Sequence, residues 1–291
     1  MSETEIVSGV EPKALALFFA LLEANTGIAL GPSKEYLLNS RLGGLARDNG
    51  LTSVSALVDQ LLRTPVGSLH WQAFDAMATH ETFFFRDKLH FELLKNELMP
   101  KMLQKNADKR QLNIWCAAAS TGQEPYSMAI LLQEEFALLQ NWKISIHATD
   151  MSDKSLAQAR SGIYSSIEMG RGLNAEQIKR HFDPLATGQY QIHAGLRQCI
   201  QFYRLNLLDT WSQLPLFDLI LLRNALIYFN QETKAVVLKK ISSHLSETTG
   251  YLMLGSSESI FFDPSLTTRR LERVTYYRKA VVSGSSAHSQ N

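Results

Sequence analysis

The chain has 291 residues, of which 45% are hydrophobic and 20% are charged, and this composition excludes a fibrous or disordered protein. A formal net charge of +1 gives no overall electrostatic attraction to nucleic acid or to a membrane surface, so neither is expected as a partner. Two distant cysteines, Cys116 and Cys199, fit neither a disulfide framework nor a metal site.

The start of the chain has neither the basic residues nor the apolar run of a signal peptide. No segment approaches the roughly 20 consecutive apolar residues of a membrane span. We therefore expect a cytoplasmic protein that does not insert into a membrane. The length favours two packed domains.

Apolar residues recur at three- and four-residue intervals through the first part of the chain, which predicts helices. The predicted helices span Pro12–Glu23, Ser33–Asp48, Ser53–Arg63 and Ser68–Ala78. Glycine and proline punctuate the first gap between them. These segments together predict an all-helical N-terminal domain over residues 1–85.

After a linking helix over Lys88–Gln104, short apolar strands alternate with helices. Strands are predicted at Leu112–Ala117, Ile144–Thr149, Ile200–Leu205, Phe217–Leu222 and Tyr251–Gly255, with intervening helices such as Pro125–Leu139 and Gln231–Glu247. This alternation predicts an α/β domain with a doubly wound, Rossmann-like and mostly parallel sheet, whose ligands bind beyond the carboxyl ends of the strands.

Three further segments complete the predicted architecture. Alternating residues within Phe182–Phe202 predict a small antiparallel excursion from the main sheet. Residues Thr267–Ala280 are predicted to add two antiparallel strands at its edge. The small and polar residues 281–291 predict a disordered tail.

The first predicted strand ends in a loop that resembles a nucleotide-binding loop. In AAASTGQEP, Ala117, Ala119 and Gly122 have the spacing of the motif G-x-G-x-x-G. Alanine Cβ atoms narrow the space that a dinucleotide pyrophosphate needs, so the loop favours S-adenosylmethionine (SAM) over a nicotinamide cofactor. An ordinary strand-to-helix turn is the alternative.

Asp150 closes the second predicted strand. Its carboxylate can accept hydrogen bonds from both ribose hydroxyls of a nucleoside, as an acidic residue does in this position of the nucleotide-binding motif. The alternative is that it caps the helix that follows.

Five segments together identify a family: THETFFFRD (79–87), AAASTGQEPYSMAI (117–130), RSGIY (160–164), NLLD (206–209) and LLRNALIYF (221–229). In this order they resemble the chemotaxis receptor methyltransferase family, CheR, over roughly residues 12–280. The resemblance implies a receptor-facing helical domain followed by a class I SAM-dependent methyltransferase domain over residues 86–280. It also implies a small antiparallel β-subdomain at about residues 182–202.

The resemblance implies a SAM-dependent protein-glutamate O-methyltransferase. Such an enzyme forms glutamate methyl esters on chemotaxis-type receptors for sensory adaptation, releases S-adenosylhomocysteine, and needs no metal. The expected partners are these receptors, and the expected state is a monomer. A SAM-binding regulatory or scaffolding protein without turnover is the alternative.

Carried over by position, the resemblance implies these cofactor contacts: His80, Thr82, Arg86, Glu124, Asp150, Asn206, Leu207, Arg223 and Asn224. His80 stands where well-known members carry asparagine, and its titration is expected to add a pH dependence. Each residue also has a purely structural interpretation. Glu124 can favour the start of a helix, and Arg223 can form an ion pair.

The implied chemistry needs alignment rather than a base, because a glutamate carboxylate is already ionised at neutral pH. Arg86 and Tyr228 are the catalytic candidates. Arg86 can hold a carboxylate with its guanidinium group, either that of the substrate or that of the cofactor. Tyr228 can orient the substrate oxygen or face the sulfonium cation.

Two features bear on how receptors are recognised. The segment Ser33–Asp48 offers Lys34, Arg41 and Arg47 to an acidic helical substrate, with an ordinary solvated face as the alternative. The turn DPLATGQ (183–189) is about three residues shorter than in members that capture a receptor's C-terminal peptide by strand addition. We therefore expect an enzyme that does not depend on a C-terminal pentapeptide.

Overall fold

The computed structural model describes residues 9–136, 139, 141–260 and 263–280. The predicted tail, residues 281–291, lies outside this range. No helix within it is both long and apolar enough to cross a membrane.

The N-terminal domain is helical, as predicted. It contains α1 (Pro12–Thr26), the 3-10 turn η1 (Pro32–Lys34), α2 (Tyr36–Asp48), α3 (Val54–Arg63) and α4 (Ser68–Met77). Pro12 suits the first turn of α1, and Gly27 ends that helix in the left-handed conformation. The Ser53 hydroxyl caps α3 by accepting a hydrogen bond from the Ala56 amide at 3.1 Å.

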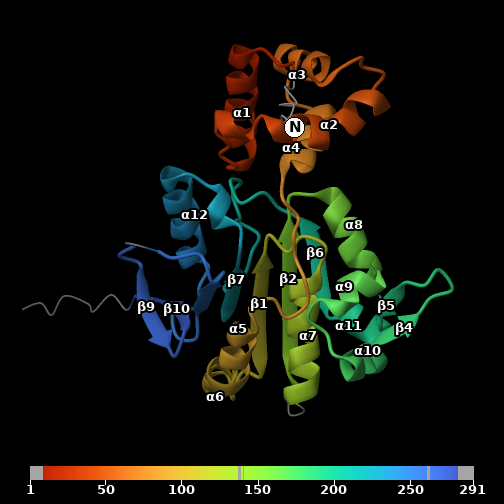
Figure 1. The fold of residues 1–291 in the computed structure, drawn as a ribbon. Coiled ribbons are helices and arrows are strands. Elements are labelled where there is room, and N and C mark those ends of the chain that lie inside the picture. The colour runs from red at the N-terminus through yellow and green to blue at the C-terminus, as the bar shows by residue number, and fades with distance from the viewer. Residues whose placement is uncertain (1–8, 137–138, 140, 261–262, 281–291) are drawn as a thin grey trace, which may run out of the picture.

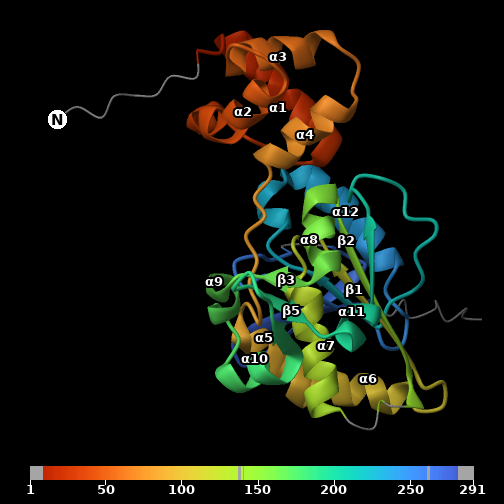
Figure 2. The ribbon, with the colours of Figure 1, turned by 90° about the vertical axis from the view of Figure 1, so that its right-hand side faces the viewer.

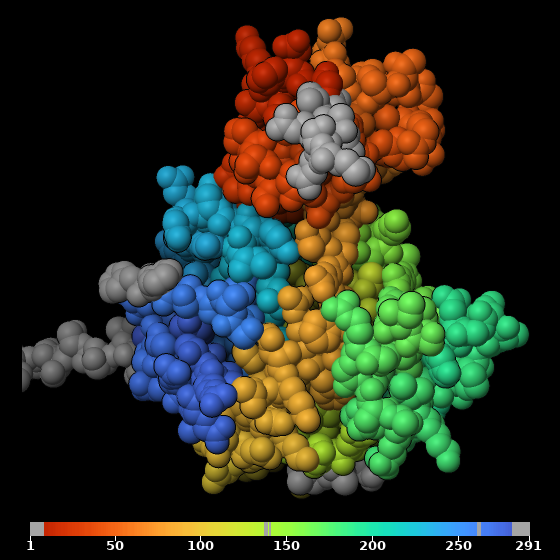
Figure 3. Space-filling view, in the orientation of Figure 1, coloured from red at the N-terminus to blue at the C-terminus, as the bar shows by residue number. Residues whose placement is uncertain are grey.

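An extended linker, residues 78–87, leads from α4 across the face of the second domain (Figures 1 and 3). It is followed by α5 (Lys88–Leu93), the π-helical turn η2 (Leu94–Leu98) and α6 (Met99–Lys105), where a single helix was predicted. The difference has a local cause. Pro100 lacks the N–H that a regular α-helix requires, and the wider π turn lies directly before it.

The second domain is built on a seven-stranded sheet with the order β6-β2-β1-β7-β8-β10-β9. Its strands are β1 (Gln111–Ala117), β2 (Lys143–Asp150), β6 (Ile200–Arg204), β7 (Leu219–Leu222), β8 (Tyr251–Leu254), β9 (Leu266–Leu271) and β10 (Val274–Lys279). The first five pair in parallel, and β10 and β9 add an antiparallel edge. The predicted sheet and its antiparallel edge are therefore confirmed.

Both faces of the sheet are covered. Ile114 and Cys116 of β1 share an apolar cluster with α5, α6 and α7 (Gln123–Glu135), whereas Trp115 and Ala117 share another with α12 (Gln231–Ser243). The cluster around α12 continues into the helical domain, so the two domains are packed together. Figures 1 and 2 show the helical domain seated above the carboxyl ends of the parallel strands.

A small antiparallel sheet has the order β3-β5-β4, formed by β3 (Ile163–Tyr164), β4 (Phe182–Pro184) and β5 (Tyr190–Ile192). In chain order β3 follows α8 (Asp153–Ser161), and α9 (Ser166–Gly170) and α10 (Ala175–His181) lie between β3 and β4.

This subdomain differs in extent from the predicted 182–202. It begins earlier, because β3 pairs with β5. It also ends earlier, since residues 194–198 form the helix α11 (Ala194–Gln198) and residues 200–202 belong to β6 of the main sheet. The alternation over residues 193–199 was wrongly interpreted as part of the antiparallel excursion, whereas the predicted strand at Ile200–Leu205 is confirmed as β6. Leu196 is buried, and it lies in a helical turn whose first hydrogen bonds are accepted by the His193 carbonyl.

Candidate functional site

A cavity lies at the carboxyl ends of β1, β2, β6 and β7, between the linker and the end of α1. It is placed where the strand order reverses, between β1 and β7, which is where open α/β sheets bind ligands. All nine predicted cofactor residues and Tyr228 line it: His80, Thr82, Arg86, Glu124, Asp150, Asn206, Leu207, Arg223, Asn224 and Tyr228. The fold thus gathers into one site residues that lie far apart in the sequence.

Asp150 ties together the loops that follow β1 and β2. One carboxylate oxygen accepts a hydrogen bond from the Ser120 amide at 2.8 Å, and the other accepts one from the Ser152 amide at 2.9 Å. Burial raises the pKa of Asp150, although these two amides oppose the rise. The helix cap that was the alternative role belongs to Ser152, whose hydroxyl accepts from the Ser155 amide at 3.0 Å.

The loop after β1 brings α7 close to the cavity. Gly122 precedes α7 with a φ of 97°, and a Cβ atom there would lie 2.9 Å from the Cβ of Ala159 in α8. A glycine is therefore required at this position. The Ser120 hydroxyl donates to the His80 carbonyl at 2.9 Å, which fastens the same loop to the linker.

His80 connects three parts of the molecule. Its Nε2 lies 3.0 Å from the Asp75 carbonyl oxygen and 3.2 Å from the Asp75 carboxylate in α4, and its Nδ1 lies 3.2 Å from the Ser155 hydroxyl in α8. Burial opposes a charge on the imidazole, but the hydrogen bonds to Asp75 outweigh it and raise the pKa of His80. His80 therefore keeps its proton to a higher pH than a free histidine does.

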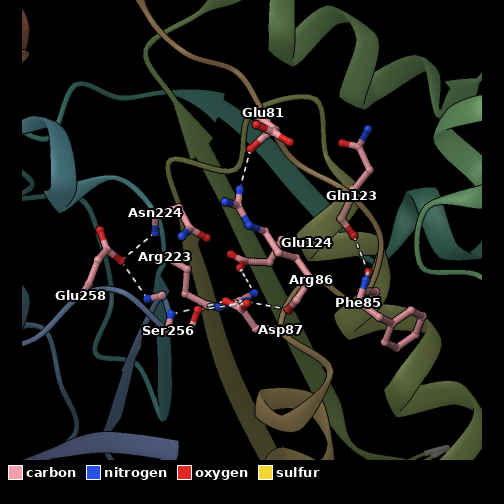
Figure 4. A network of polar contacts seen from close by, with 12 residues as sticks. Glu81, Phe85, Arg86, Asp87, Gln123, Glu124, Arg223, Asn224, Ser256 and Glu258 are labelled. Atoms are coloured by element: carbon pink, nitrogen blue, oxygen red, sulfur yellow. Dashed lines mark hydrogen bonds and ion pairs between the residues drawn. The ribbon is translucent and has the colours of Figure 1, made fainter.

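Arg223 is the centre of a buried ionic network (Figure 4). Its guanidinium group donates to Glu124 at 2.7 Å, to Asp87 at 2.9 Å and to the Arg86 carbonyl at 2.5 Å, and its side chain is only 2% exposed. Burial raises the pKa of Glu124, and Arg223 counters only part of that rise. Burial also opposes the charge on Asp87, but Arg223 outweighs it and holds the pKa of Asp87 below its usual value.

The side chain of Arg86 projects from the linker and lines the cavity, while its backbone carbonyl belongs to this network. One guanidinium nitrogen donates to the Glu81 carbonyl at 2.7 Å (Figure 4). The guanidinium group also lies 5.4 Å from the centre of the Phe83 ring. Both contacts fix the direction of the side chain. The remaining N–H groups of Arg86 are suited to a carboxylate of a ligand.

Tyr228 and Asn224 belong to the segment that follows β7. Asn224 has a left-handed φ of 60°, and Tyr228 ends the 3-10 turn η4 (Leu226–Tyr228). Both residues line the same cavity as Arg86.

Glu258 holds this segment in place, and it was not among the predicted site residues. Its carboxylate accepts hydrogen bonds from the amides of Asn224 at 2.7 Å, Gly255 at 2.7 Å and Ile227 at 3.1 Å. The available signal was a polar run directly after a predicted strand, but two of the three amides that Glu258 binds, those of Asn224 and Ile227, lie on a different loop.

The three predicted substrate-binding residues lie in the helical domain, outside the cavity wall. Arg41 is engaged within the protein. It donates to the carbonyl oxygens of Met77 and Ala78 and, at 3.2 Å, to the Thr79 hydroxyl. It therefore fastens the end of α4 to the start of the linker. Lys34 lies 5.8 Å from the centre of the Tyr36 ring, and Arg47 lies in the last turn of α2.

The donor set suits a nucleoside cofactor with a charged amino-acid end. Asp150 offers acceptors for ribose hydroxyls, Asn206 and Leu207 offer an amide and an apolar wall, and Arg86 offers donors for a carboxylate. Among the residues that the structure describes, no cluster of three or more histidine, cysteine or acidic side chains is arranged to hold a metal ion.

Comparisons with known proteins agree with this arrangement. Residues 80–274 match the family model "CheR methyltransferase, SAM binding domain", and residues 13–78 match "CheR methyltransferase, all-alpha domain". The chain is 41% identical to chemotaxis protein methyltransferase 1 of Pseudomonas aeruginosa, over 84% of this chain and 89% of that protein. It is 40% identical to chemotaxis protein methyltransferase 1 of Vibrio cholerae, over 84% and 88% of the two chains. It is 33% identical to the chemotaxis protein methyltransferase of Escherichia coli, over 82% of each.

Proposed function

Because the chain belongs to the CheR methyltransferase family, we propose that its strand-end cavity binds SAM and transfers the methyl group to glutamate side chains of chemotaxis receptors. The observation that carries this proposal is the convergence of four strand ends, the linker and the Tyr228 segment on one cavity. The family match supports a methyltransferase rather than a SAM-binding scaffold without turnover.

The reaction forms a bond between a carboxylate oxygen and the methyl carbon while the bond from that carbon to sulfur breaks. SAM supplies the methyl group as a sulfonium cation, which leaves as neutral S-adenosylhomocysteine. No proton is transferred, so the residues of the chain act by orientation. Alignment of this kind can lower a barrier by roughly 7 to 11 kcal/mol.

In this proposal Arg86 and Tyr228 orient the reacting carboxylate. Arg86 is held by Glu81 and Phe83, so it presents its donors with little loss of side-chain freedom. Tyr228 is held through its backbone and through the segment that Glu258 fixes. Arg223 keeps Glu124 and Asp87 in place and donates to the Arg86 carbonyl.

Replacing Asp150 with alanine is expected to weaken the binding of SAM and of S-adenosylhomocysteine. We expect an increase in Kd of about ten- to a hundredfold, because a hydrogen bond to a charged group contributes about 1.5 to 3 kcal/mol. Titration calorimetry measures both ligands directly. Asp153→Ala is the matched control, since Asp153 is exposed and lies outside the cavity wall. Equal affinities in the two variants would refute the ribose assignment.

We propose that the receptor meets the basic residues of the helical domain, with Lys34 and Arg47 as its direct contacts. Lys34→Glu and Arg47→Glu should each raise the receptor KM severalfold without changing SAM affinity, and the effect should shrink at high salt. Lys109→Glu, between α6 and β1, is the charge-matched control. Arg41→Glu is a poorer test because it also breaks the contact to the linker. An unchanged KM in both variants would place the receptor elsewhere.

We also propose that the protein works as a cytoplasmic monomer without a receptor tail peptide. In the small sheet β5 is central, so a peptide could add only at β3 or β4, and the turn between β4 and β5 is closed by a hydrogen bond from the Leu185 amide to the Gln189 carbonyl at 2.8 Å. Titration with tail pentapeptides of the host's receptors is expected to show no binding. Low-micromolar binding that is lost in Gln191→Pro, which disrupts β5, would contradict this expectation.

A further inference from the structure

The end of α1 and the turn that follows it, residues 25–29, belong to the helical domain but form part of the cavity. We call this segment the α1 turn. Thr26 and Ile28 line the cavity together with Asp150 and Leu207. Thr26 and Ile28 are 2% and 8% exposed, so they are wall residues rather than surface residues.

The α1 turn is bonded to the two segments that carry predicted ligand contacts. The Asn25 carbonyl accepts a hydrogen bond from the side-chain amide of Asn206 at 2.6 Å. The Ala29 amide donates to the Tyr228 carbonyl at 2.9 Å, and Ile28 forms an antiparallel bridge with Phe229. The position of Tyr228 therefore depends on the backbone of the helical domain.

The α1 turn is itself rigid. The Thr26 hydroxyl donates to the Leu22 carbonyl at 2.7 Å and accepts from the Ile28 amide at 3.1 Å. One further contact fixes the residues on either side, since the side-chain amide of Asn230 donates to the Glu23 carboxylate at 2.5 Å. A movement of α1 is thus transmitted to the segment 228–230.

We propose that the α1 turn positions Tyr228 and Asn206 and closes one end of the cofactor cavity, so the helical domain is a working part of the methyl-transfer site as well as a receptor-facing surface. This inference rests on the proposed function. It assigns positioning roles to residues outside the segments that the sequence motifs indicate.

Gly27 gives a test with a matched control. Its φ is 79°, and a Cβ atom there would lie 3.0 Å from Thr233 and 3.1 Å from the Phe229 ring. Gly50 has a similar φ of 69°, but a Cβ atom there would meet nothing within 4 Å. Gly27→Ala and Gly50→Ala therefore carry a similar backbone cost, and only Gly27→Ala displaces Phe229 and its neighbour Tyr228.

We expect Gly27→Ala to raise the SAM Kd and to lower turnover at saturating SAM, each by about tenfold, because misplacement by a fraction of an ångström disturbs alignment. Gly50→Ala should match the wild type in both quantities, with a smaller loss of melting temperature than Gly27→Ala, because it carries the backbone cost without the steric contacts. Equal SAM affinity and equal turnover in the two variants would overturn the proposal.

Ile28→Ala keeps the test informative if Gly27→Ala does not fold. It preserves the glycine and the backbone pairing and removes only the side chain that lines the cavity. Several-fold weaker SAM binding by a folded Ile28→Ala protein is expected, and unchanged affinity would overturn the proposal. Calorimetry needs no receptor, so this result can be separated from a failure of receptor methylation in the wild type.

Discussion

Arg223→Met is expected to lower the free energy of unfolding by about 3 to 5 kcal/mol, the cost of removing one partner from a buried ionic group. The reason lies in the ionic network of Arg223, Glu124 and Asp87, of which Arg223 and Glu124 line the cavity. Arg223 is the cation between Glu124 and Asp87, and without it two partly buried carboxylates are left without their ion-pair partner. Urea denaturation in the absence of SAM measures the loss.

The loss should depend on pH in a defined direction. The lowered pKa of Asp87 contributes stability above its unfolded-state value, and this stability disappears as pH falls through the folded-state value. Glu124 has a raised pKa and needs no cation once it is protonated. The deficit of Arg223→Met should therefore be largest at neutral pH and shrink towards about pH 4.

A double variant tests whether the unpaired carboxylates cause the loss of stability. Adding Glu124→Gln to Arg223→Met should recover part of the lost stability, because one of the two unpaired carboxylates is then neutral. A loss below about 1 kcal/mol in Arg223→Met, or no recovery in the double variant, would show that the network contributes little.

Arg86→Ala is expected to reduce methyl transfer by about a hundredfold at saturating SAM, because a reacting carboxylate held 1 Å out of line loses about that much rate. Tyr228→Phe should have a smaller effect, since it removes one hydroxyl and keeps the ring. The measurement is the initial rate of receptor methylation, with SAM affinity determined separately. A change in rate at full SAM occupancy identifies a role in positioning the receptor glutamate.

Arg171 provides the control for Arg86. The guanidinium groups of Arg171 and Arg86 both lie near the Phe83 ring, that of Arg171 at 4.7 Å from the ring centre. Both also contact Glu81. Of the two, only Arg86 lines the cavity. Arg171→Ala should therefore retain most of the turnover. Wild-type turnover in Arg86→Ala at saturating SAM and receptor would remove Arg86 from the mechanism.

Most of the fold was predictable because its main elements carry strong periodic signals. The buried strands β7 and β8 are continuous apolar runs, and the helices of the N-terminal domain repeat their apolar residues at helical spacing. The start of the small sheet was not predictable, since β3 has only two residues and no period can be detected in it. The helix α11 was missed because a short alternating segment precedes it directly.

The candidate site was predictable only where a residue belongs to a motif of the family. Glu258 was missed because its carboxylate acts on the backbone of a loop 34 residues away in sequence. The sequence predicted Arg41 only as a receptor contact, because a sequence cannot show that its guanidinium group also meets the carbonyl oxygens at the end of α4. The α1 turn was missed for the same reason, since its hydrogen bonds join segments 181 residues apart.

Methyl transfer from labelled SAM to receptor-containing membranes tests the central claim most directly. Wild-type protein should place base-labile label on receptor glutamates, Arg86→Ala should place about a hundredfold less, and Arg171→Ala should resemble the wild type. Calorimetry on the same preparations shows whether SAM is bound. Label that appears on receptor glutamates as methyl ester is the predicted result, whereas a protein that binds SAM but leaves every receptor glutamate unlabelled would contradict it.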